Sequence, residues 1–285
     1  FFLSMLVTND VALITFVPFT CSLLQRDDQR KILLRIVVIE AAAANLGSMA
    51  TPIGNPQNLY LYSTYSFSLG TFFKTILPIV GISYIGLLFS LLLIPQQPLA
   101  AEIPTETHLP LSAQKKNLII YSILGVVCLA TVAGFVTHVI CFCVVLLGMI
   151  VTDRALIRRV DWELLLTFVC FFLFSGNLQQ IESVRNLMMQ GLSGGVCLTA
   201  ALVSQVISNV PAAVLLSGFT EQGKELLMGV DIGGLGTPIA SLASLIAYQY
   251  YAKSKLANPA KYLQFFFIYQ FIGLFLLLAM KFIML

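Results

Sequence analysis

Long stretches of mostly apolar residues alternate along the chain with short polar segments. The runs at 76–94, 118–136 and 265–285 are long enough to cross a bilayer as helices, because about 20 residues span its hydrocarbon core. Two further apolar stretches, 32–65 and 226–250, are interrupted in their middle by Gly, Pro, Asn and Ser. Residues of these types break helices. The pattern therefore predicts broken spans beside continuous ones.

The expected elements follow from this alternation, and composition agrees with them. Hydrophobic residues make up 58% of the chain and charged residues 10%, whereas a soluble domain carries about 25% charged residues. We predict an all-α polytopic membrane protein, embedded in the lipid bilayer. Its expected elements are a re-entrant arm at 9–24, a re-entrant hairpin at 190–219, the two broken spans, and full spans at 76–95, 117–135, 138–152, 162–180 and 262–284.

Two polar motifs occur twice in the same order. VTNDVALITFVPFT (7–20) matches ISNVPAAVLLSGFT (207–220) at a shift of 200 residues, and ATPIGNPQNL (50–59) matches GTPIASLASL (236–245) at a shift of 186. Such duplications occur in transporter folds. We expect inverted repeats, each with a re-entrant hairpin and a broken transmembrane helix. Residues 1–95 then form the end of the first repeat, whose N-terminal spans are missing, 96–116 a cytoplasmic linker, and 117–285 the second repeat.

Basic residues indicate the orientation, because Lys and Arg gather on the cytoplasmic side. With these elements, only Lys74, Arg185, Lys224 and Lys281 face one side. The others, at 26, 30, 31, 35, 115, 116, 154, 158, 159, 253, 255 and 261, face the opposite side. The richer side is expected to be cytoplasmic, which inverts the two halves and places the C-terminus outside. A single span over 191–219 would instead move the three lysines after residue 250 outside.

The polar interruptions are expected near the middle of the membrane. A rise of about 1.5 Å per residue places Gly47 about 18 Å from Arg35, in a core about 30 Å thick. Helices that restart there present free N–H groups and positive dipole ends, and helices that stop there present carbonyls. Alternatively, Pro and Gly only kink these helices and Asn and Ser bond their neighbours. The expected substrate- or ion-binding residues are Thr8, Asn9, Asp10, Thr51, Gly54, Asn55, Asn58, Ser208, Asn209, Thr237, Ser241 and Ser244.

Two acids are expected at membrane depth, where ionisable residues usually serve a function. Asp10 and Glu40 are therefore candidate coupling acids, as proton carriers or cation ligands. Alternatively, Asp10 caps the helix that follows it and Glu40 pairs within the bundle.

Four segments together resemble the ion transporter superfamily, in particular the citrate-permease and arsenite/sodium–proton antiporter permeases and the related divalent anion/sodium symporters. They are TNDVALITFVP, NLGSMATPIGNPQN, SNVPAAVLLSG and GGLGTPIASLAS. The resemblance implies a scaffold domain, a mobile transport domain with elevator-like movement, frequent homodimers and a plasma-membrane location, the inner membrane in bacteria. In the sodium–carboxylate symporters, Ser-Asn-Thr at each hairpin tip binds sodium and carboxylate. By that likeness sodium is expected at Thr8, Asn9, Ser208 and Asn209, although Asp10 and Val210 replace the threonine.

These features predict a secondary active transporter that moves a small anion, a carboxylate or an inorganic oxyanion, coupled to sodium or protons. The alternatives are a proton-coupled cation antiporter or arsenite-type efflux permease centred on Asp10, and a passive ion channel. We expect no enzyme, because no nucleophile motif or His/Cys/acid cluster occurs at depth. No cofactor beyond the coupling ion is expected. Nucleic acid is not expected as a partner, because the basic residues lie between spans.

Overall fold

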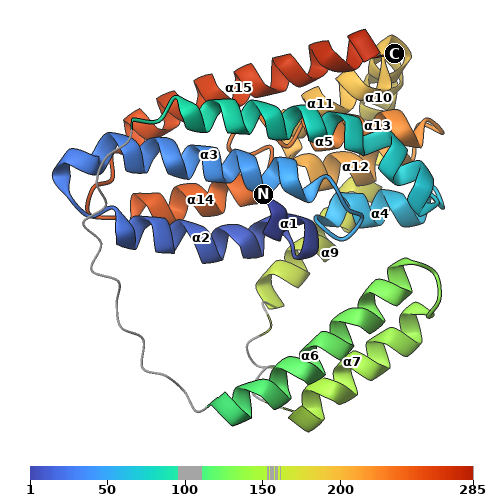
Figure 1. The fold of residues 1–285 in the computed structure, drawn as a ribbon. Helices are drawn as coiled ribbons and strands as arrows, with labels where there is room; N and C mark the ends of the chain where they lie inside the picture. The colour runs from blue at the N-terminus through green and yellow to red at the C-terminus, as the bar shows by residue number, and fades with distance from the viewer. Residues whose placement is uncertain (96–110, 153, 155–156, 158–159, 161, 285) are drawn as a thin grey trace. The chain divides into compact units, whose positions relative to one another are not determined.

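The computed structural model describes residues 1–95, 111–152, 154, 157, 160 and 162–284, with backbone alone for 27, 111–117, 164 and 284. Within these residues all regular structure is helical (Figure 1). The chain divides into two compact units, Phe1–Glu102 with Cys170–Leu285, and Ile103–Val169. Residues 96–110 of the expected linker, together with Arg158 and Arg159, lie outside the described part.

The second unit contains a helical pair and the beginning of α9 (Trp162–Gln180). The pair consists of α6 (Leu111–Val132) and α7 (His138–Thr152), which occupy the expected spans at 117–135 and 138–152. The side chain of Leu124 on α6 fills the space that a Cβ atom at Gly148 on α7 would need. A small residue therefore lets the two helices approach closely.

The first unit contains two long helices and a set of shorter ones. The long helices are α5 (Leu69–Leu92) and α15 (Pro259–Met284). The others are α1 (Phe2–Leu6), α2 (Asn9–Leu23), the 3-10 turn η1 (Asp27–Gln29), α3 (Arg30–Ser48), α4 (Pro56–Thr64), the end of α9, α10 (Glu182–Gly194), α11 (Val196–Ile207), α12 (Asn209–Ser217), α13 (Gly223–Ile232) and α14 (Leu242–Ala252).

Only some of these helices are long and apolar enough to span a membrane. Among the described residues, Leu69–Leu92 and Pro259–Ile283 are long and apolar enough to cross a membrane. A third candidate is the bent pair Leu165–Gln180 and Glu182–Gly194, whose axes meet at 91°. Asn9–Leu23 and Val196–Ile207 are apolar but shorter than a bilayer crossing. The set of apolar helices is consistent with a membrane protein.

Both polar interruptions predicted inside apolar stretches separate two helices. α3 ends at Ser48 and α4 begins at Pro56, while α13 ends at Ile232 and α14 begins at Leu242. The start of α4 has a local cause, because the Asn55 side chain accepts the backbone N–H of Asn58 at 3.0 Å. Pro56 follows at the first helical position, where its missing N–H removes no helical bond.

Some boundaries differ from the predicted ones. The helix expected from 76 begins at Leu69, because the hydroxyl of Ser68 caps it by accepting the Thr71 N–H at 3.1 Å. The arm expected from 190 begins at Val196. Residues before it continue α10 as far as Gly194, and Gly195 then turns the chain with φ of +142°, which favours glycine.

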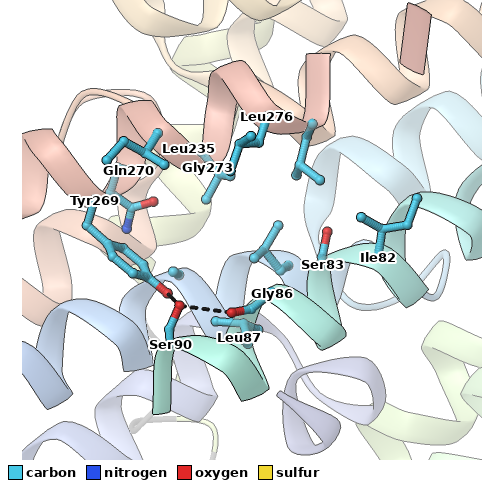
Figure 2. A pocket seen from close by; sticks show the side chains of 14 residues that line it. Ile82, Ser83, Gly86, Leu87, Ser90, Leu235, Tyr269, Gln270, Gly273 and Leu276 are labelled. Carbon is cyan, nitrogen blue, oxygen red and sulfur yellow. Dashed lines mark hydrogen bonds between the residues drawn. The ribbon is translucent and has the colours of Figure 1, made fainter. Parts of the chain in front are cut away.

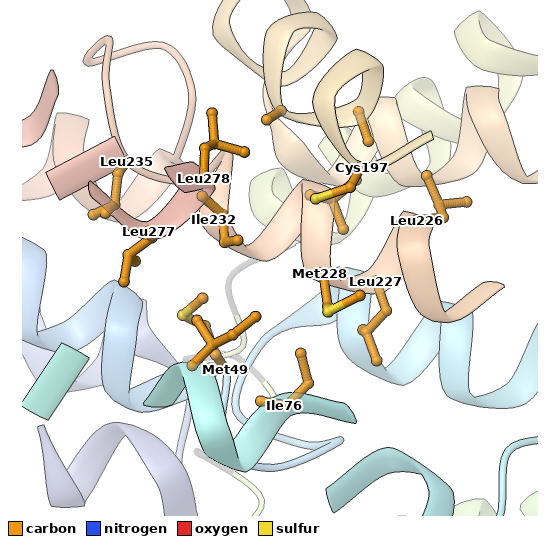
Figure 3. Packing of buried hydrophobic residues seen from close by; sticks show 14 of the residues in the cluster. Met49, Ile76, Cys197, Leu226, Leu227, Met228, Ile232, Leu235, Leu277 and Leu278 are labelled. Carbon is orange, nitrogen blue, oxygen red and sulfur yellow. The ribbon is translucent and has the colours of Figure 1, made fainter. Parts of the chain in front are cut away.

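Helices α3 and α13, which each end at one of the two polar interruptions, are each packed against several other helices of the first unit. α3 packs against α1, α2, α14, α5 and α15, and α13 packs against α11, α12, α4, α15 and α5. α2 also packs against α14, and α12 against α4. Figure 1 shows α3 running beside α2, α14 and α5. The core around α13 is apolar, with Ile232, Leu235 and Leu277 converging on the region of Met49 (Figure 3).

Close packing of α13 against α11 depends on two glycines one helical turn apart. A Cβ atom at Gly229 would lie 2.7 Å from the Ala200 methyl carbon, and one at Gly233 would lie 2.8 Å from the Ala201 Cα. We expect Gly229→Val to destabilise the protein by about 1–3 kcal/mol, because it overpacks this contact. Thermal unfolding of the purified protein measures the effect. Gly81→Val is the matched control, since a Cβ there meets no atom within 4 Å. Equal unfolding midpoints for the two variants would contradict the prediction.

A cavity of about 160 Å³ lies between α3, α5 and α15. Figure 2 shows the Tyr269 hydroxyl donating to the Ser90 hydroxyl at 2.9 Å, and Ser90 donating to the Gly86 carbonyl at 2.9 Å. A second cavity, of about 240 Å³, is lined by Lys74, Lys224 and Lys281 among others. No residue of the predicted binding site lines either cavity.

Candidate functional site

The starts of α2 and α12 are each tied to the loop of a broken helix by a backbone hydrogen bond. The N–H of Asn9 donates to the Gly54 carbonyl at 3.2 Å, and the N–H of Asn209 donates to the Ala240 carbonyl at 2.9 Å. Gly54 and Ala240 are the positions that the 186-residue shift superimposes. The two repeated motifs of each half therefore meet, the helix start of one against the loop of the other.

The threonines of the two Thr-Pro-Ile motifs form a second matching pair. The Thr51 hydroxyl donates to the Met5 carbonyl at 2.6 Å, and the Thr237 hydroxyl donates to the Gln205 carbonyl at 2.9 Å. Each hydroxyl proton is engaged in holding a loop to the helix on which the acceptor lies. The described geometry thus gives Thr51 and Thr237 a positioning role.

Asn45, on α3, gathers polar groups from both halves of the chain. Its side-chain oxygen accepts hydrogen bonds from Asn9 Nδ2 at 3.0 Å and from the Ser241 hydroxyl at 2.8 Å. Its Nδ2 donates to the Ser244 hydroxyl at 3.3 Å and the Gly234 carbonyl at 3.4 Å. Only 5% of Asn45 is exposed. We call Asn9, Asn45, Ser241 and Ser244 the Asn45 cluster. Three of its members, Asn9, Ser241 and Ser244, were predicted site residues. Asn45, which binds all three, was not predicted from the sequence.

Asp231, on α13, is the centre of a second group, which we call the Asp231 cluster. Its Oδ1 accepts a hydrogen bond from Gln57 Nε2 on α4 at 3.3 Å. The side chains of Asn55 and Asn58 lie beside the same carboxylate. Asn55 Nδ2 also donates to the Ser48 hydroxyl at 3.2 Å. The predicted residues Asn55 and Asn58 are therefore brought together around an acid of the other half of the chain.

The residues that flank the two tip asparagines differ between the halves. Thr8 caps α2 by accepting the N–H of Val11 at 3.4 Å. Asp10 is 8% exposed, and its Oδ1 has no hydrogen-bond partner among the described residues. Ser208 has a φ of +73° and donates from its hydroxyl to the Ala240 carbonyl at 3.3 Å. Non-glycine residues rarely adopt this backbone conformation, and such strain concentrates at functional sites.

Glu40, the second candidate coupling acid, has a separate environment. Its Oε1 accepts a hydrogen bond from the Thr20 hydroxyl of α2 at 2.5 Å, and its Oε2 has no partner in the described residues. No hydrogen bond links it to either cluster. This bond joins Glu40 on α3 to Thr20 on α2.

Comparison with known protein families shows to which family the chain belongs. Residues 1–221 match the family model described as citrate transporter, which is most of the 285-residue sequence.

The chain belongs to the citrate transporter family.

Two curated relatives agree with this placement. The uncharacterized transporter MJ0456 of Methanocaldococcus jannaschii is 33% identical over 246 residues, which cover 86% of this chain and 66% of the relative. The inner membrane protein YbiR of Escherichia coli is 33% identical over 254 residues, covering 86% of this chain and 65% of the relative. The match spans just under two thirds of each relative's length. Family membership and the apolar helices together identify an integral membrane protein of the citrate-permease type.

In this member of the citrate transporter family, sequence reasoning missed four residues that organise the site. They are Asn45, Gln57, Gln205 and Asp231. A signal for two of them exists, because the 186-residue shift superimposes Asn45 and Asp231, both polar within apolar helices. Gln205 donates to the Gly233 and Leu235 carbonyls, both at 2.9 Å, and its Oε1 accepts the Thr237 N–H at 2.8 Å. Only the folded structure brings these groups together.

In this member of the citrate transporter family, most potential ligands in the region of the two clusters are neutral oxygen atoms. Among the described residues, no group of three or more His, Cys, Asp or Glu could hold a metal ion. Amide, hydroxyl and backbone carbonyl oxygens dominate both clusters. Oxygen atoms of these types suit hard cations and are poor ligands for soft transition metals.

Proposed function

We propose that this family member is a secondary active transporter that carries a small anion, a carboxylate or an inorganic oxyanion, coupled to sodium or protons. The observation that carries the proposal is the matched placement of Asn9 and Asn209. Each begins a helix, and each is bonded through its backbone to the loop of a broken helix. These contacts bring the start of α2 close to that of α4 and the start of α12 close to that of α14. Neutral amide and hydroxyl groups lie beside these helix starts.

Anion binding is favoured at such a place for a physical reason. The first turn of each helix has backbone N–H groups without intrahelical partners and carries the positive end of the helix dipole. Neutral polar side chains orient an anion there without a fixed positive charge that membrane burial would disfavour. The name of the family, citrate transporter, makes carboxylates the first anions to test.

The matching contacts support an inverted-repeat architecture as part of the same proposal. α2 with α14 and α12 with α4 are equivalent pairs, and each joins one half of the chain to the other. We propose two inverted repeats, each with a re-entrant hairpin and a broken helix. Because the basic residues favour one side as cytoplasmic, we propose that the C-terminus lies outside the cytoplasm, in the inner membrane if the protein is bacterial, which a reporter fused to the C-terminus would test. The superfamily resemblance adds a homodimer to this proposal.

Transport requires the site to open. Asn9, Asn55, Asn58, Asn209 and both serines of the Asn45 cluster are buried in this conformation. An anion reaches them only when α2, α4, α12 and α14 separate on one side. Because each of these helices contacts the opposite half, a relative movement of helices changes access to all four helix starts together.

Flux into proteoliposomes containing the full-length protein tests the proposal. Citrate, dicarboxylates, arsenite and sulfate are offered under an inward sodium gradient or a pH gradient. Asn9→Ala and Asn209→Ala are each expected to reduce uptake at least tenfold, because each removes an amide beside a helix start. Asn177→Ala, which changes an exposed asparagine of α9, is the matched control. Wild-type uptake in both tip variants would exclude the proposed site.

The same assay separates the alternatives. Gradient-driven accumulation excludes a passive channel, which equilibrates its substrate and does no more. Asp10 carries the antiport alternative, because one of its carboxylate oxygens is buried and unpaired at the start of α2. Cation exchange against protons without any anion uptake would favour a proton-coupled cation antiporter centred on this acid.

A further inference from the structure

The carboxylate of Asp231 is buried with half of its hydrogen-bonding capacity unused. Only 3% of Asp231 is exposed. Its Oδ1 accepts from Gln57, whereas its Oδ2 has no hydrogen-bond partner among the described residues. An ionised carboxylate can accept at both oxygens, and leaving one unpaired inside a protein is costly. The amides of Asn55 and Asn58 lie beside this carboxylate, yet Oδ2 has no bond of hydrogen-bond geometry with any described residue and is available to a bound partner.

A second unpaired oxygen belongs to the neighbouring Asn58. This residue is fully buried, and its Nδ2 donates to the carbonyls of Met49 at 3.2 Å and Thr51 at 3.3 Å. These two bonds fix which end of the amide is nitrogen, because a carbonyl can only accept. The amide oxygen of Asn58 is left without a partner. Within the described part of the chain, the Asp231 cluster therefore contains two buried acceptor oxygens without a hydrogen-bond partner.

No positive charge among the described residues forms an ion pair with Asp231. α13 packs against α3, α4, α5, α11, α12 and α15. The ionisable groups on these helices include Glu40, Tyr60, Lys74, Cys197, Tyr269 and Lys281; α3 and α15 also have basic residues near their starts, and tyrosines occur elsewhere on α4, α5 and α15. Among the described residues, none of them is hydrogen-bonded or ion-paired to Asp231.

Glu225, the other acid on α13, already has a basic partner on α15. Lys281 pairs with Glu225 at 2.6 Å. Glu225 precedes Asp231 by about 9 Å along α13, at about 1.5 Å per residue. Lys281 is thus engaged elsewhere, and a lone ionised carboxylate at membrane depth is strongly disfavoured.

We propose that Asp231 and the amide oxygen of Asn58 form the site of one monovalent coupling cation, either sodium or a proton. The proposal rests on the proposed anion transport and names the residue at which the cation is carried. A cation there bridges α13 to the first turn of α4. It thereby fixes a helix start that belongs to the proposed anion site, which links cation binding to anion binding.

The first half of the chain supplies the internal comparison. Asn45 occupies the position matched to Asp231 by the 186-residue shift, and both of its amide atoms are hydrogen-bonded. The site of the first half is therefore neutral and complete, and that of the second half is charged and open. One cation per chain follows from this asymmetry.

The test uses the full-length protein carrying Asp231→Asn, with Glu225→Gln as the control acid on the same helix. Asparagine is accommodated at the matched position 45, so this variant preserves the shape of the site. In proteoliposomes, Asp231→Asn is expected to lower cation-driven anion accumulation at least tenfold, and Glu225→Gln to lower it less than twofold. Loss under a sodium gradient identifies sodium, and loss under a pH gradient identifies the proton.

A binding measurement makes the result independent of anion transport. The difference in thermal midpoint between wild type and Asp231→Asn is measured in sodium chloride against choline chloride, and again across pH. A difference that changes with sodium, or with pH, supports the cation site even if none of the tested anions is carried, in which case the proposed function alone fails. Asn58→Ala, which keeps the carboxylate, is expected to raise the half-effective cation concentration at least fivefold. Wild-type accumulation in Asp231→Asn, or a midpoint difference independent of both sodium and pH, overturns the proposal.

Discussion

Asn45→Ala is expected to eliminate anion uptake and to lower the thermal midpoint of the purified protein by roughly 5–15 °C. The substitution removes four hydrogen bonds, to Asn9, Ser241, Ser244 and the Gly234 carbonyl. Each buried polar group left without a partner costs about 1–3 kcal/mol. A loss of several kcal/mol corresponds to a midpoint change of this size for a domain of about 200 residues.

The expected effect is specific to the position. Asn186→Ala changes an exposed asparagine of α10 and is expected to leave both uptake and midpoint near wild type. If Asn45→Ala unfolded at the wild-type temperature, the Asn45 cluster would not contribute to stability as its hydrogen bonds indicate. Uptake and unfolding are measured separately, so a stable but inactive variant would assign Asn45 to the anion site alone.

Gln205→Met is expected to have an effect of similar size through the loop between α13 and α14. The side-chain amide of Gln205 makes three hydrogen bonds to this loop. It donates to the carbonyls of Gly233 and Leu235 and accepts from the N–H of Thr237. Methionine preserves length and removes every polar contact, so two or more backbone groups lose their partners at about 1–3 kcal/mol each. We expect a midpoint lower by roughly 5–10 °C and uptake below detection, because the start of α14 loses its position.

The matched control is Gln249→Met, at an exposed position of α14. The same chemical change there removes no contact of the loop and is expected to leave transport intact. Limited proteolysis adds a structural readout, because the loop after α13 should become accessible in Gln205→Met. Protection equal to that of the wild type would show that other contacts hold the loop.

The local features of the fold could be predicted from the sequence because short-range chemistry determines them. Asn55 followed by Pro56 gives a helix start in the predicted interruption, and α4 begins there. α7 matches its expected span from His138 to Thr152. The family was also correctly identified, since the repeated polar motifs carry the resemblance.

The clusters could not be predicted, because they depend on contacts between distant parts of the chain. Asn45 meets Ser241 across 196 positions, and Gln57 meets Asp231 across 174. A pattern of polar residues indicates that a segment needs partners, but it does not say which partner packs against it. For this reason Asp231 resembled any polar residue near a helix end. Only the packing of α13 against α4 shows that its second oxygen has no partner.

The dependence of each half on the other has a consequence for how the protein is made. Asn45 emerges from the ribosome long before Ser241. At about 5–20 residues per second, the 196 positions between them take roughly 10–40 s to synthesise. During that interval the side chain of Asn45 lacks its partners Ser241 and Ser244. The Asn45 cluster can therefore form only after α14 has been synthesised.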